Sequence, residues 1–256
     1  MTQTQPQTQT TTTTDQPVAI VTGASRGIGA QIAQRLAYDG YRVVINYQAN
    51  AQAADALVAQ IEKQGGKALA IQADISNPEQ VDALFAQTKQ SFGRIDALIN
   101  NAGILQVTPM AETSIEQLNR AFAINTQGTF LTMQAAYKEM ATGGRIINLS
   151  STTLALNMPG YGLYNGTKAA VEAFTRIFAK EMRGKNITVN AVAPGPVSTE
   201  LFLNGKSDEQ IAQFSKMPPL ERLGQPSDIA NVISFLCSAD AGWINGQIIR
   251  ANGGIG

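Results

Sequence analysis

Tyr164 and Lys168 stand four residues apart in the stretch YGLYNGTKAAVEAF, which runs from Tyr161 to Phe174. On a helix, residues at this spacing lie on one face, within one turn of each other. A phenol beside an ammonium group is a candidate acid–base device. The alternative is an ordinary amphipathic helix with a polar first turn, and the pair by itself does not decide between them.

Histidine is absent from all 256 residues. This absence excludes histidine-based catalytic triads, histidine general bases and zinc sites that use histidine. The single cysteine, Cys237, excludes an internal disulfide and a cysteine-only metal site, and it is typical of a reducing compartment. Proton transfer must therefore use Tyr, Lys, Asp, Glu, Ser or a cofactor, and no metal site is predicted.

The charge balance restricts the class of protein. Lys plus Arg and Asp plus Glu number 19 each, so the formal net charge is zero and the basic footprint of a nucleic-acid-binding protein is missing. No apolar run approaches the ~20 residues that span a bilayer, and the N-terminal stretch lacks the features of a secretory signal. We expect a cytoplasmic protein without nucleic-acid or membrane partners, and a disordered polar tail over residues 1–16.

Seven short β-branched runs alternate with helical patterns after this tail. They read as nearly continuous apolar stretches, which is typical of strands covered on both faces. The runs are residues 18–23, 42–47, 68–74, 97–103, 145–151, 187–195 and 247–254. Between them, stripes such as Ile28, Ile32 and Leu36 indicate amphipathic helices. Repeated strand–helix–strand units predict one α/β domain over residues 17–256, with a seven-stranded parallel, doubly wound sheet flanked by helices.

The first strand runs directly into TGASRGIGAQIAQRL, which carries Gly23, Gly27 and Gly29. A glycine loop between a first strand and a first helix lets the backbone approach a pyrophosphate. The helix N-terminus then offers free N–H groups and a positive dipole end. A plain tight turn is the structural alternative, but three glycines in so short a span favour a nucleotide site.

The end of the second strand bears on which dinucleotide binds. It reads RVVINYQAN, with Asn46 and Tyr47 in place of the carboxylate that commonly bonds a ribose 2′-hydroxyl. Arg26 lies inside the glycine loop, and a guanidinium binds phosphate well. NADP(H) is therefore favoured over NAD(H), unless Arg26 is only a solvated surface charge. Asp74 ends the third strand and could bond the adenine amino group, or serve only as a loop residue that caps the following helix.

Several ordered segments together resemble the short-chain dehydrogenase/reductase family. TGASRGIG at 22–29 resembles its cofactor loop, and NNAG at 100–103 its fourth-strand motif. NAVAPGPVST at 190–199 and IRANGG at 249–254 resemble its proline–glycine segment and its C-terminal strand. The resemblance covers essentially everything from Pro17 onward. It implies a Rossmann-fold oxidoreductase that uses NAD(H) or NADP(H), commonly as a homotetramer, with the helix near 222–236 and the last strand as candidate interfaces.

The catalytic residues carry the most specific part of this resemblance. Tyr164 and Lys168 match the family's Tyr-x-x-x-Lys motif, Ser151 precedes the tyrosine at the usual interval, and Asn125 matches a helical asparagine. Hydride transfer to a ketone leaves an alkoxide, so Tyr164 is expected to act as acid in reduction and as base in oxidation. Lys168 is expected to lower the pKa of Tyr164, because its charge favours tyrosinate. Ser151 can donate to the carbonyl oxygen, while a water held by Asn125 and linked to Lys168 is implied by the resemblance alone.

The resemblance also implies cofactor contacts along the ends of several strands. Asn101 and Gly103 are expected beside the cofactor, and Thr199 is expected to bond the nicotinamide carboxamide, to cap the next helix, or to do both. The full set of expected cofactor residues is Gly23, Ser25, Arg26, Gly27, Ile28, Gly29, Asn46, Tyr47, Asp74, Ile75, Asn101, Ala102, Gly103, Tyr164, Lys168, Pro194, Gly195, Val197 and Thr199.

The substrate is predicted less sharply than the cofactor. Residues 196–226 have helix-like and loop-like stretches without a strand pattern, and so long an insertion is a candidate substrate lid. The expected substrate contacts are Leu105, Ser151, Thr153, Tyr161 and Phe202. They are mostly apolar or neutral, which favours a neutral, moderately apolar ketone or its alcohol. Ordinary packing would account for the apolar ones equally well.

Three alternatives to an NADP-dependent carbonyl reductase remain open. A 3-oxoacyl-carrier-protein reductase of the same family would dock an acidic partner, and this balanced chain shows no basic patch for one. A non-catalytic NADP-binding regulator would have no need of Ser151, Tyr164 and Lys168 together. Epimerases and dehydratases with this fold are usually longer, with a C-terminal substrate domain. The complete set of motifs therefore favours the reductase.

Overall fold

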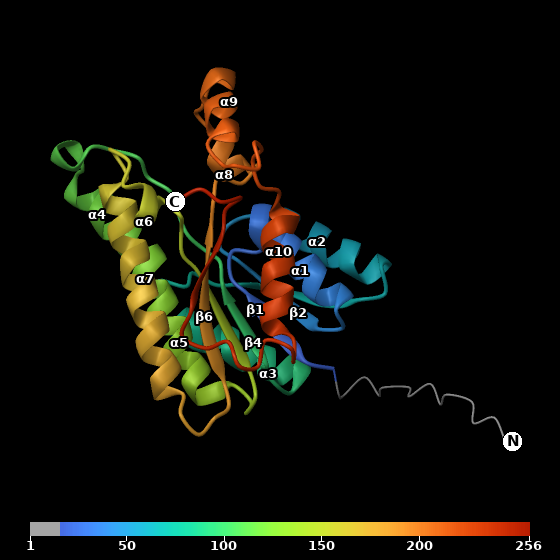
Figure 1. Cartoon of the computed structure of the whole chain (residues 1–256). Helices are drawn as coiled ribbons and strands as arrows, with labels where there is room; N and C mark the ends of the chain where they lie inside the picture. The colour runs from blue at the N-terminus through green and yellow to red at the C-terminus, as the bar shows by residue number, and fades with distance from the viewer. Residues whose placement is uncertain (1–15) are drawn as a thin grey trace, which may run out of the picture.

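The computed structural model describes residues 16–256. The predicted polar tail therefore lies outside the described residues, apart from Gln16. Seven strands pair in parallel in one sheet, in the order β3-β2-β1-β4-β5-β6-β7 (Figure 1). Their bounds are β1 Val18–Val21, β2 Arg42–Tyr47, β3 Lys67–Gln72, β4 Ala97–Asn100, β5 Arg145–Leu149, β6 Thr188–Pro194 and β7 Ile248–Ala251. The predicted seven-stranded parallel sheet is confirmed.

Helices cover both faces of this sheet. One apolar core packs α1, α2 and α10 on one face, and a second packs α3, α5 and α7 on the other. The helices are α1 Gly27–Tyr38, α2 Ala51–Lys63, α3 Pro78–Phe92, α4 Ile115–Ala121, α5 Gly128–Glu139, α6 Thr153–Leu156, α7 Gly162–Glu181, α8 Glu200–Leu203, α9 Asp208–Lys216 and α10 Pro226–Cys237. This double cover explains why the strands read as continuous apolar runs rather than as alternating ones.

The order of the strands places a binding edge at the centre of the sheet. β1 pairs with β2 on one side and with β4 on the other, so the chain reverses its direction of travel across the sheet between them. In such sheets, ligands bind outside the carboxyl ends of the strands at this switch point. The loops that follow β1, β2, β4, β5 and β6 all emerge at that edge (Figure 1).

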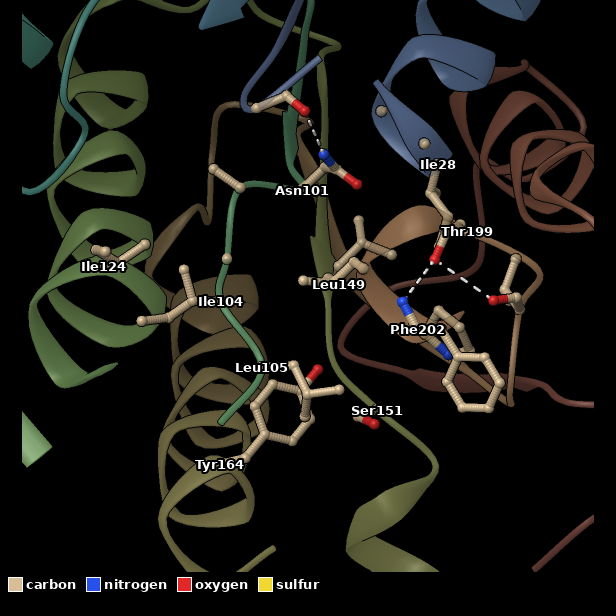
Figure 2. A pocket seen from close by; sticks show the side chains of 18 of the residues that line it. Ile28, Asn101, Ile104, Leu105, Ile124, Leu149, Ser151, Tyr164, Thr199 and Phe202 are labelled. Atoms are coloured by element: carbon tan, nitrogen blue, oxygen red, sulfur yellow. Dashed lines mark hydrogen bonds between the residues drawn. The ribbon is translucent and has the colours of Figure 1, made fainter. Parts of the chain in front are cut away.

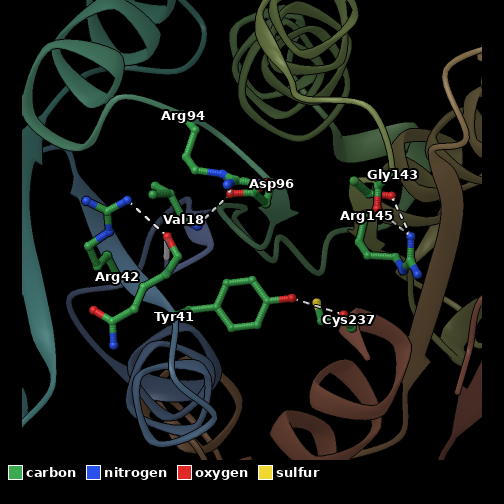
Figure 3. Close-up of polar contacts among 10 residues, drawn as sticks. Val18, Tyr41, Arg42, Arg94, Asp96, Gly143, Arg145 and Cys237 are labelled. Atoms are coloured by element: carbon green, nitrogen blue, oxygen red, sulfur yellow. Dashed lines mark hydrogen bonds and ion pairs between the residues drawn. The ribbon is translucent and has the colours of Figure 1, made fainter. Parts of the chain in front are cut away.

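Polar contacts join the elements at the opposite edge of the sheet, where the strands begin (Figure 3). Asp96 accepts the backbone N–H of Val18 at 2.8 Å and pairs with Arg94 at 2.7 Å, which anchors the start of β1 beside β4. The Tyr41 hydroxyl donates to the carbonyl of Cys237 at 3.0 Å. Burial raises the pKa of the Cys237 thiol to about 12. This cysteine is therefore a packing residue, far from the binding edge.

Helix α7 buries the side chain of Lys168 beside a stripe of uncharged residues. Its buried positions Leu163, Thr167, Val171 and Thr175 recur every four residues and form one stripe against the sheet. Lys168 follows Thr167 on the same stripe and is only 4% exposed. The helix thus carries its lysine into the interior because the residues around it bury their own side chains.

A wide turn separates α4 from α5. Residues Phe122–Gln127 form a π-helix, and the backbone remains helical on both sides of it. A π-turn closes its hydrogen bonds one residue later than an α-turn, and such turns occur frequently at functional sites. Asn125 lies inside this turn and is completely buried. The turn directs that side chain toward the loop after β4.

Residues 196–226, which we call the lid segment, rise beyond the carboxyl edge of the sheet (Figure 1). As predicted, the segment contains helices but none of the seven strands; a single bridge joins Val197 to Gly224. Neither α8 nor α9 has a buried residue. Within residues 16–256, no helix combines the length and the apolarity needed to cross a bilayer.

Candidate active site

One cavity runs along the binding edge and gathers nearly all of the predicted site residues (Figure 2). Every residue expected to contact the cofactor or the substrate lines it. Among the expected catalytic residues, Ser151, Tyr164 and Lys168 line it as well, whereas Asn125 lies behind its wall. Across the part of the chain that the structure describes, no His, Cys, Asp or Glu side chains are grouped as a metal site would require.

The glycine loop is packed against the end of β4. Gly23 has a φ of +60°, and a Cβ there would lie 2.8 Å from the Cα of Ala102. A Cβ on Gly29 would lie 2.5 Å from Asn101 Nδ2. That amide nitrogen donates to the carbonyls of Thr22 at 2.9 Å and Gly23 at 3.1 Å. The NNAG motif therefore shapes the glycine loop, and the glycines leave room for this contact.

Two residues that were expected to bind the cofactor, Asn46 and Asp74, form hydrogen bonds with other groups of the protein. Asn46 accepts from the Gly23 N–H at 3.3 Å and donates to the Ala73 carbonyl at 3.0 Å, so it ties three strand ends together. Burial alone would raise the pKa of Asp74, but hydrogen bonds from Ser76 and Gln48 outweigh it and lower that pKa. Asp74 is thus an ionised turn residue in the cavity wall, and the cap of α3 is Asn77 instead.

Arg26 and Thr199 connect the glycine loop with the lid segment. Arg26 precedes α1, and its Nη1 lies 3.1 Å from Glu200 Oε2, with both side chains exposed. Thr199 is the N-cap of α8, because its Oγ1 accepts the N–H of Phe202 at 3.2 Å (Figure 2). The capping role expected of Thr199 is confirmed. An exposed pair such as Arg26–Glu200 contributes little to stability, so the guanidinium can exchange partners at low cost.

Lys168 is held by the sheet rather than by Tyr164. Its Nζ donates to the carbonyl of Leu149, the last residue of β5, at 2.7 Å. The same Nζ is 5.8 Å from the centre of the Tyr164 ring. Burial lowers the pKa of Lys168 to about 8. Its side chain is therefore fixed in position, while its positive charge is less favoured than on a surface lysine.

The pKa of Tyr164 moves in the direction opposite to the sequence-based prediction. Burial raises it to about 12, a hydrogen bond with Ser151 lowers it, and the neighbouring Tyr161 raises it further. Lys168 is not among the groups that shift this pKa, so its expected lowering effect stays a prediction. Spacing along the helix places the two groups on one face, but burial penalises tyrosinate more than any neighbour favours it.

The two serines after β5, Ser150 and Ser151, have different hydrogen-bond partners. Ser151 is 8% exposed, lines the cavity and forms the hydrogen bond with Tyr164. The Ser150 hydroxyl donates to Glu172 Oε1 on α7 at 2.7 Å, and its backbone N–H donates to the carbonyl of Val192 on β6. Ser150 thus joins β5 to its neighbours, and only Ser151 is placed for chemistry.

Asn125 clamps the loop after β4 from behind the cavity. Its Oδ1 accepts the N–H of Ile104 at 2.8 Å, and its Nδ2 donates to the Ile104 carbonyl at 2.9 Å and to Thr167 Oγ1 at 3.1 Å. A Cβ on Gly103 would lie 3.1 Å from Asn125 Oδ1 and 3.6 Å from Lys168 Nζ. The amide is thus near the lysine, but its direct contacts are with Ile104 and Thr167.

The predicted substrate contacts Leu105, Thr153, Tyr161 and Phe202 form the apolar end of the cavity, where Tyr161 is 7% exposed. Sequence reasoning missed further lining residues: Gln48, Ala49 and Asn50 after β2, and Met158, Phe214 and Ile255 at the apolar end. The first three directly follow the strand motif RVVINY, and extending that motif would have found them. Nothing local marks the other three, since the chain folds back to bring them there.

Comparison with known proteins places this site in a family. The model of a family described as enoyl-(acyl carrier protein) reductase matches residues 23–256. A protein of Picea abies named short-chain type dehydrogenase/reductase is 44% identical over 93% of this chain and 91% of its own. Versicolorin reductase 1 of Aspergillus parasiticus is 42% identical, over 94% of this chain and 96% of its own.

A solved structure agrees with these matches. Angucycline C-6 ketoreductase LanV, crystallised with bound NADP, superposes with a TM-score of 0.88 at 37% identity, covering 93% of this chain and 95% of its own. The chain belongs to the short-chain dehydrogenase/reductase family, as its motifs predicted. It is accordingly an oxidoreductase with the Rossmann-type fold of that family.

Proposed function

We propose that this chain is an NADP(H)-dependent carbonyl reductase that converts a neutral, moderately apolar ketone to its alcohol. The observation that carries the proposal is the convergence of Ser151, Tyr164 and Lys168 at one end of a cavity whose other end is a glycine loop. Reductases among the relatives, and the NADP bound by the similar ketoreductase, support the same reaction class.

The residues around the glycine loop fit a dinucleotide. Gly23 and Gly27 both have positive φ values, near +60°, and α1 begins at Gly27 with no acidic residue in its first turn. A helix N-terminus of this kind favours an anion such as a pyrophosphate. When bound, the cofactor supplies the hydride. Lys168 and Thr199 line the part of the cavity between the loop and Tyr164, where the reacting ring would be held.

In the proposed reaction, the chain's own groups act on the carbonyl oxygen. Tyr164, with its pKa raised to about 12, stays protonated at neutral pH, which is the form that donates a proton. Ser151 adds a second hydrogen bond to the same oxygen as negative charge develops there. Lys168, fixed by Leu149, keeps its Nζ 5.8 Å from the centre of the Tyr164 ring. In the reverse direction the same groups act on the alcohol, and Tyr164 takes the proton back.

NADP(H) is preferred to NAD(H) in this proposal because of the groups around the end of β2. Tyr47, Gln48, Ala49 and Asn50 line the cavity there, and none of them is acidic. Helix α2 begins directly afterwards, with no acidic residue in its first turn. Arg26, in the glycine loop, lines the same cavity. A 2′-phosphate held beside residues 47–50 would therefore meet a helix N-terminus and a guanidinium, with no carboxylate on those four residues.

A panel assay tests the proposed function. NADPH and NADH oxidation would be followed with small aliphatic, bulky aromatic and 3-oxoacyl thioester ketones, and with an enone whose product is identified by mass spectrometry. We expect NADPH-dependent formation of alcohols from neutral ketones. Preference for NADH would overturn the Arg26 argument. Reduction of the enone C=C bond without reduction of any ketone, or cofactor binding without turnover, would overturn the carbonyl reductase.

We further propose that the chain assembles with copies of itself, as a homotetramer. Phe235 on α10 is nearly half exposed, and Trp243 in the loop before β7 is 98% exposed. Phe235 lies on the helix that the family resemblance gives as a candidate interface, and burying its side chain against another copy would favour association. Light scattering at micromolar concentration would give the mass of the particle, and a monomer would contradict the proposal.

A further inference from the structure

Ser151 is contacted by a residue outside the catalytic set, and that residue is held in turn by another. Thr153, the first residue of α6, donates its backbone N–H to Ser151 Oγ at 3.3 Å, and its Oγ1 lies 2.9 Å from the same oxygen. Asn165, which follows Tyr164 on α7, lies on the far side of Thr153, with 2.7 Å between its Oδ1 and Thr153 Oγ1. These contacts link the two catalytic segments along the wall of the cavity, through Thr153 and then Asn165.

Counting protons gives these contacts a direction. The Asn165 Nδ2 donates to the carbonyl of Thr153 at 3.0 Å, so the amide oxygen must be the atom that faces the Thr153 hydroxyl. An amide oxygen only accepts, so the Thr153 hydroxyl is the donor toward Asn165. The same hydroxyl is the donor toward Ser151 Oγ, so its proton lies between two acceptor oxygens. With the Thr153 N–H and O–H both directed at its oxygen, Ser151 keeps its own proton for Tyr164, and a hydrogen bond in this direction lowers the pKa of Tyr164.

We propose that Thr153 and Asn165 are positioning residues that fix the place and the rotation of the Ser151 hydroxyl for carbonyl reduction. Donation runs from Thr153 to Ser151 and from Ser151 toward Tyr164, while Asn165 holds the Thr153 hydroxyl from the far side. Such chains polarise one another and hold each proton in a defined direction. A carbonyl oxygen that enters beside Ser151 and Tyr164 would accept a hydrogen bond from the Ser151 hydroxyl, whose oxygen the Thr153 N–H and O–H keep in place, and would take its proton from Tyr164. The inference rests on the proposed function.

A purely structural role is the competing explanation. Asn165 bonds both the backbone and the side chain of Thr153, so the pair also fastens the four-residue helix α6 to α7. If fastening were its only task, loss of the Thr153 hydroxyl would reduce stability and leave the rate of the chemical step unchanged. The two roles therefore differ in their effects on kcat, and not merely in their effects on folding.

Four variants separate these roles. Thr153→Val keeps the shape of the side chain and removes the hydroxyl, and we expect it to lower kcat about tenfold, the value of one hydrogen bond in the transition state. KM for the ketone should stay within about twofold, since the serine contact acts mainly as charge develops. Thr153→Ser restores the hydroxyl and should restore kcat to within about twofold. Asn165→Leu should lower kcat, and adding it to Thr153→Val should cause no further loss, because Asn165 acts through Thr153.

Thr152→Val is the matched control. The Thr152 hydroxyl donates to the carbonyl of Ala193 at 3.1 Å and accepts from Asn252 Nδ2 at 3.2 Å, so its hydrogen bonds go to β6 and to the segment after β7. This variant should lose stability in urea and keep the parent kcat. Thr153→Ser as slow as Thr153→Val, or losses that multiply in the double variant, would overturn the inference.

A crystal structure supplies a readout that does not need turnover. In Thr153→Val we expect the Ser151 side chain to occupy more than one rotamer, whereas the parent holds one. A single unchanged rotamer in the variant would contradict the positioning role. If the parent reduced no ketone at all, the proposed function would fall, and the rotamers would still decide whether Thr153 positions Ser151.

Discussion

The catalytic corner around Ser151, Tyr164 and Lys168 and the lid segment of residues 196–226 border the same cavity but are built in opposite ways. The corner is anchored to the sheet, with Lys168 bonded to the end of β5 and buried almost completely. The lid segment buries no residue of α8 or α9. Two of its residues that line the cavity, Phe202 and Phe214, contact each other edge to face with ring centres 5.1 Å apart.

Under the proposed function, this contrast would separate the reaction from the choice of substrate. Groups that must hold hydrogen-bond geometry are placed on strands and on a long packed helix, where neighbours fix their rotamers. Groups that only need to exclude water and match a shape are placed on short exposed helices, which have low local stability. Changes in the lid segment should therefore alter which ketone reacts, and changes in the corner should alter whether any ketone reacts.

Tyr164→Phe is expected to have the largest effect on the corner. It removes the proton donor and keeps the ring, so kcat for ketone reduction should fall about 1000-fold. The dissociation constant of NADPH, measured by fluorescence titration, should stay within about twofold. Tyr161→Phe, seven positions before Lys168 in the same segment, is the comparison, and its kcat should fall far less. A Tyr164→Phe enzyme within tenfold of the parent would mean that another group supplies the proton.

Lys168→Met tests the cost of burying a charge in the corner. The pKa of Lys168 is about 8 in the folded protein and 10.5 in an unfolded chain. Between pH 8 and pH 10.5, the folded state has therefore released a proton that the unfolded chain retains. The parent's free energy of unfolding should therefore rise with pH in this interval. Relative to Lys168→Met, the parent should gain about 2 kcal/mol between pH 7 and pH 10.

Urea unfolding at several pH values measures this gain. Below pH 8 both states keep the proton, so the difference between parent and variant should be constant there. Lys180→Met, the same change on the exposed end of α7, is the control. A parent and a Lys168→Met variant that respond identically to pH would show that the lysine is not desolvated.

Arg26→Ala acts where the glycine loop meets the lid segment. We expect kcat/KM to fall about 20-fold with NADPH and to change little with NADH, because a charge-assisted bond to the 2′-phosphate is lost. Glu200→Gln is the matched change on the other side of the pair and should raise the affinity for NADPH slightly, since Glu200 competes for the guanidinium. Equal losses with both cofactors would remove the basis for NADP preference.

Phe202→Ala should have the smallest effect, confined to the lid segment. The loss of one aromatic wall should raise KM about fivefold for a bulky ketone and leave a small ketone unaffected. The midpoint of urea unfolding should hardly move, because α8 contributes no buried residue. A large fall in kcat for every ketone would show that the two regions are less separate than their construction indicates.

The sequence predicted the sheet well because its signal is local. Each apolar run became a strand, but several strands end before the run does. The run 97–103 was expected to be a strand throughout, whereas β4 ends at Asn100. Asn101 leaves the ladder to bond the backbone of the glycine loop, and a pattern of apolar residues cannot show such a contact.

The site was predictable wherever motifs carry it, and not where burial decides. Spacing placed Tyr164 and Lys168 on one face, but only the structure shows that burial raises one pKa and lowers the other. Phe214 and Ile255 line the cavity because distant segments fold back over it. The network of Thr153 and Asn165 was equally hidden, since a threonine and an asparagine twelve residues apart have no spacing signature.

The π-turn at Phe122–Gln127 has a consequence for how this chain can vary in length. It contains one residue more than a regular turn, and deleting any one of the six would let α4 and α5 merge into an ordinary helix. Because a π-turn fits its extra residue into the rotation of one regular turn, α4 and α5 would keep nearly the same angular setting after the deletion. The residues inside the turn would change direction, and the contact of Asn125 with Ile104 would be lost. A single substitution here changes one side chain, whereas a single deletion would redirect every side chain within the turn.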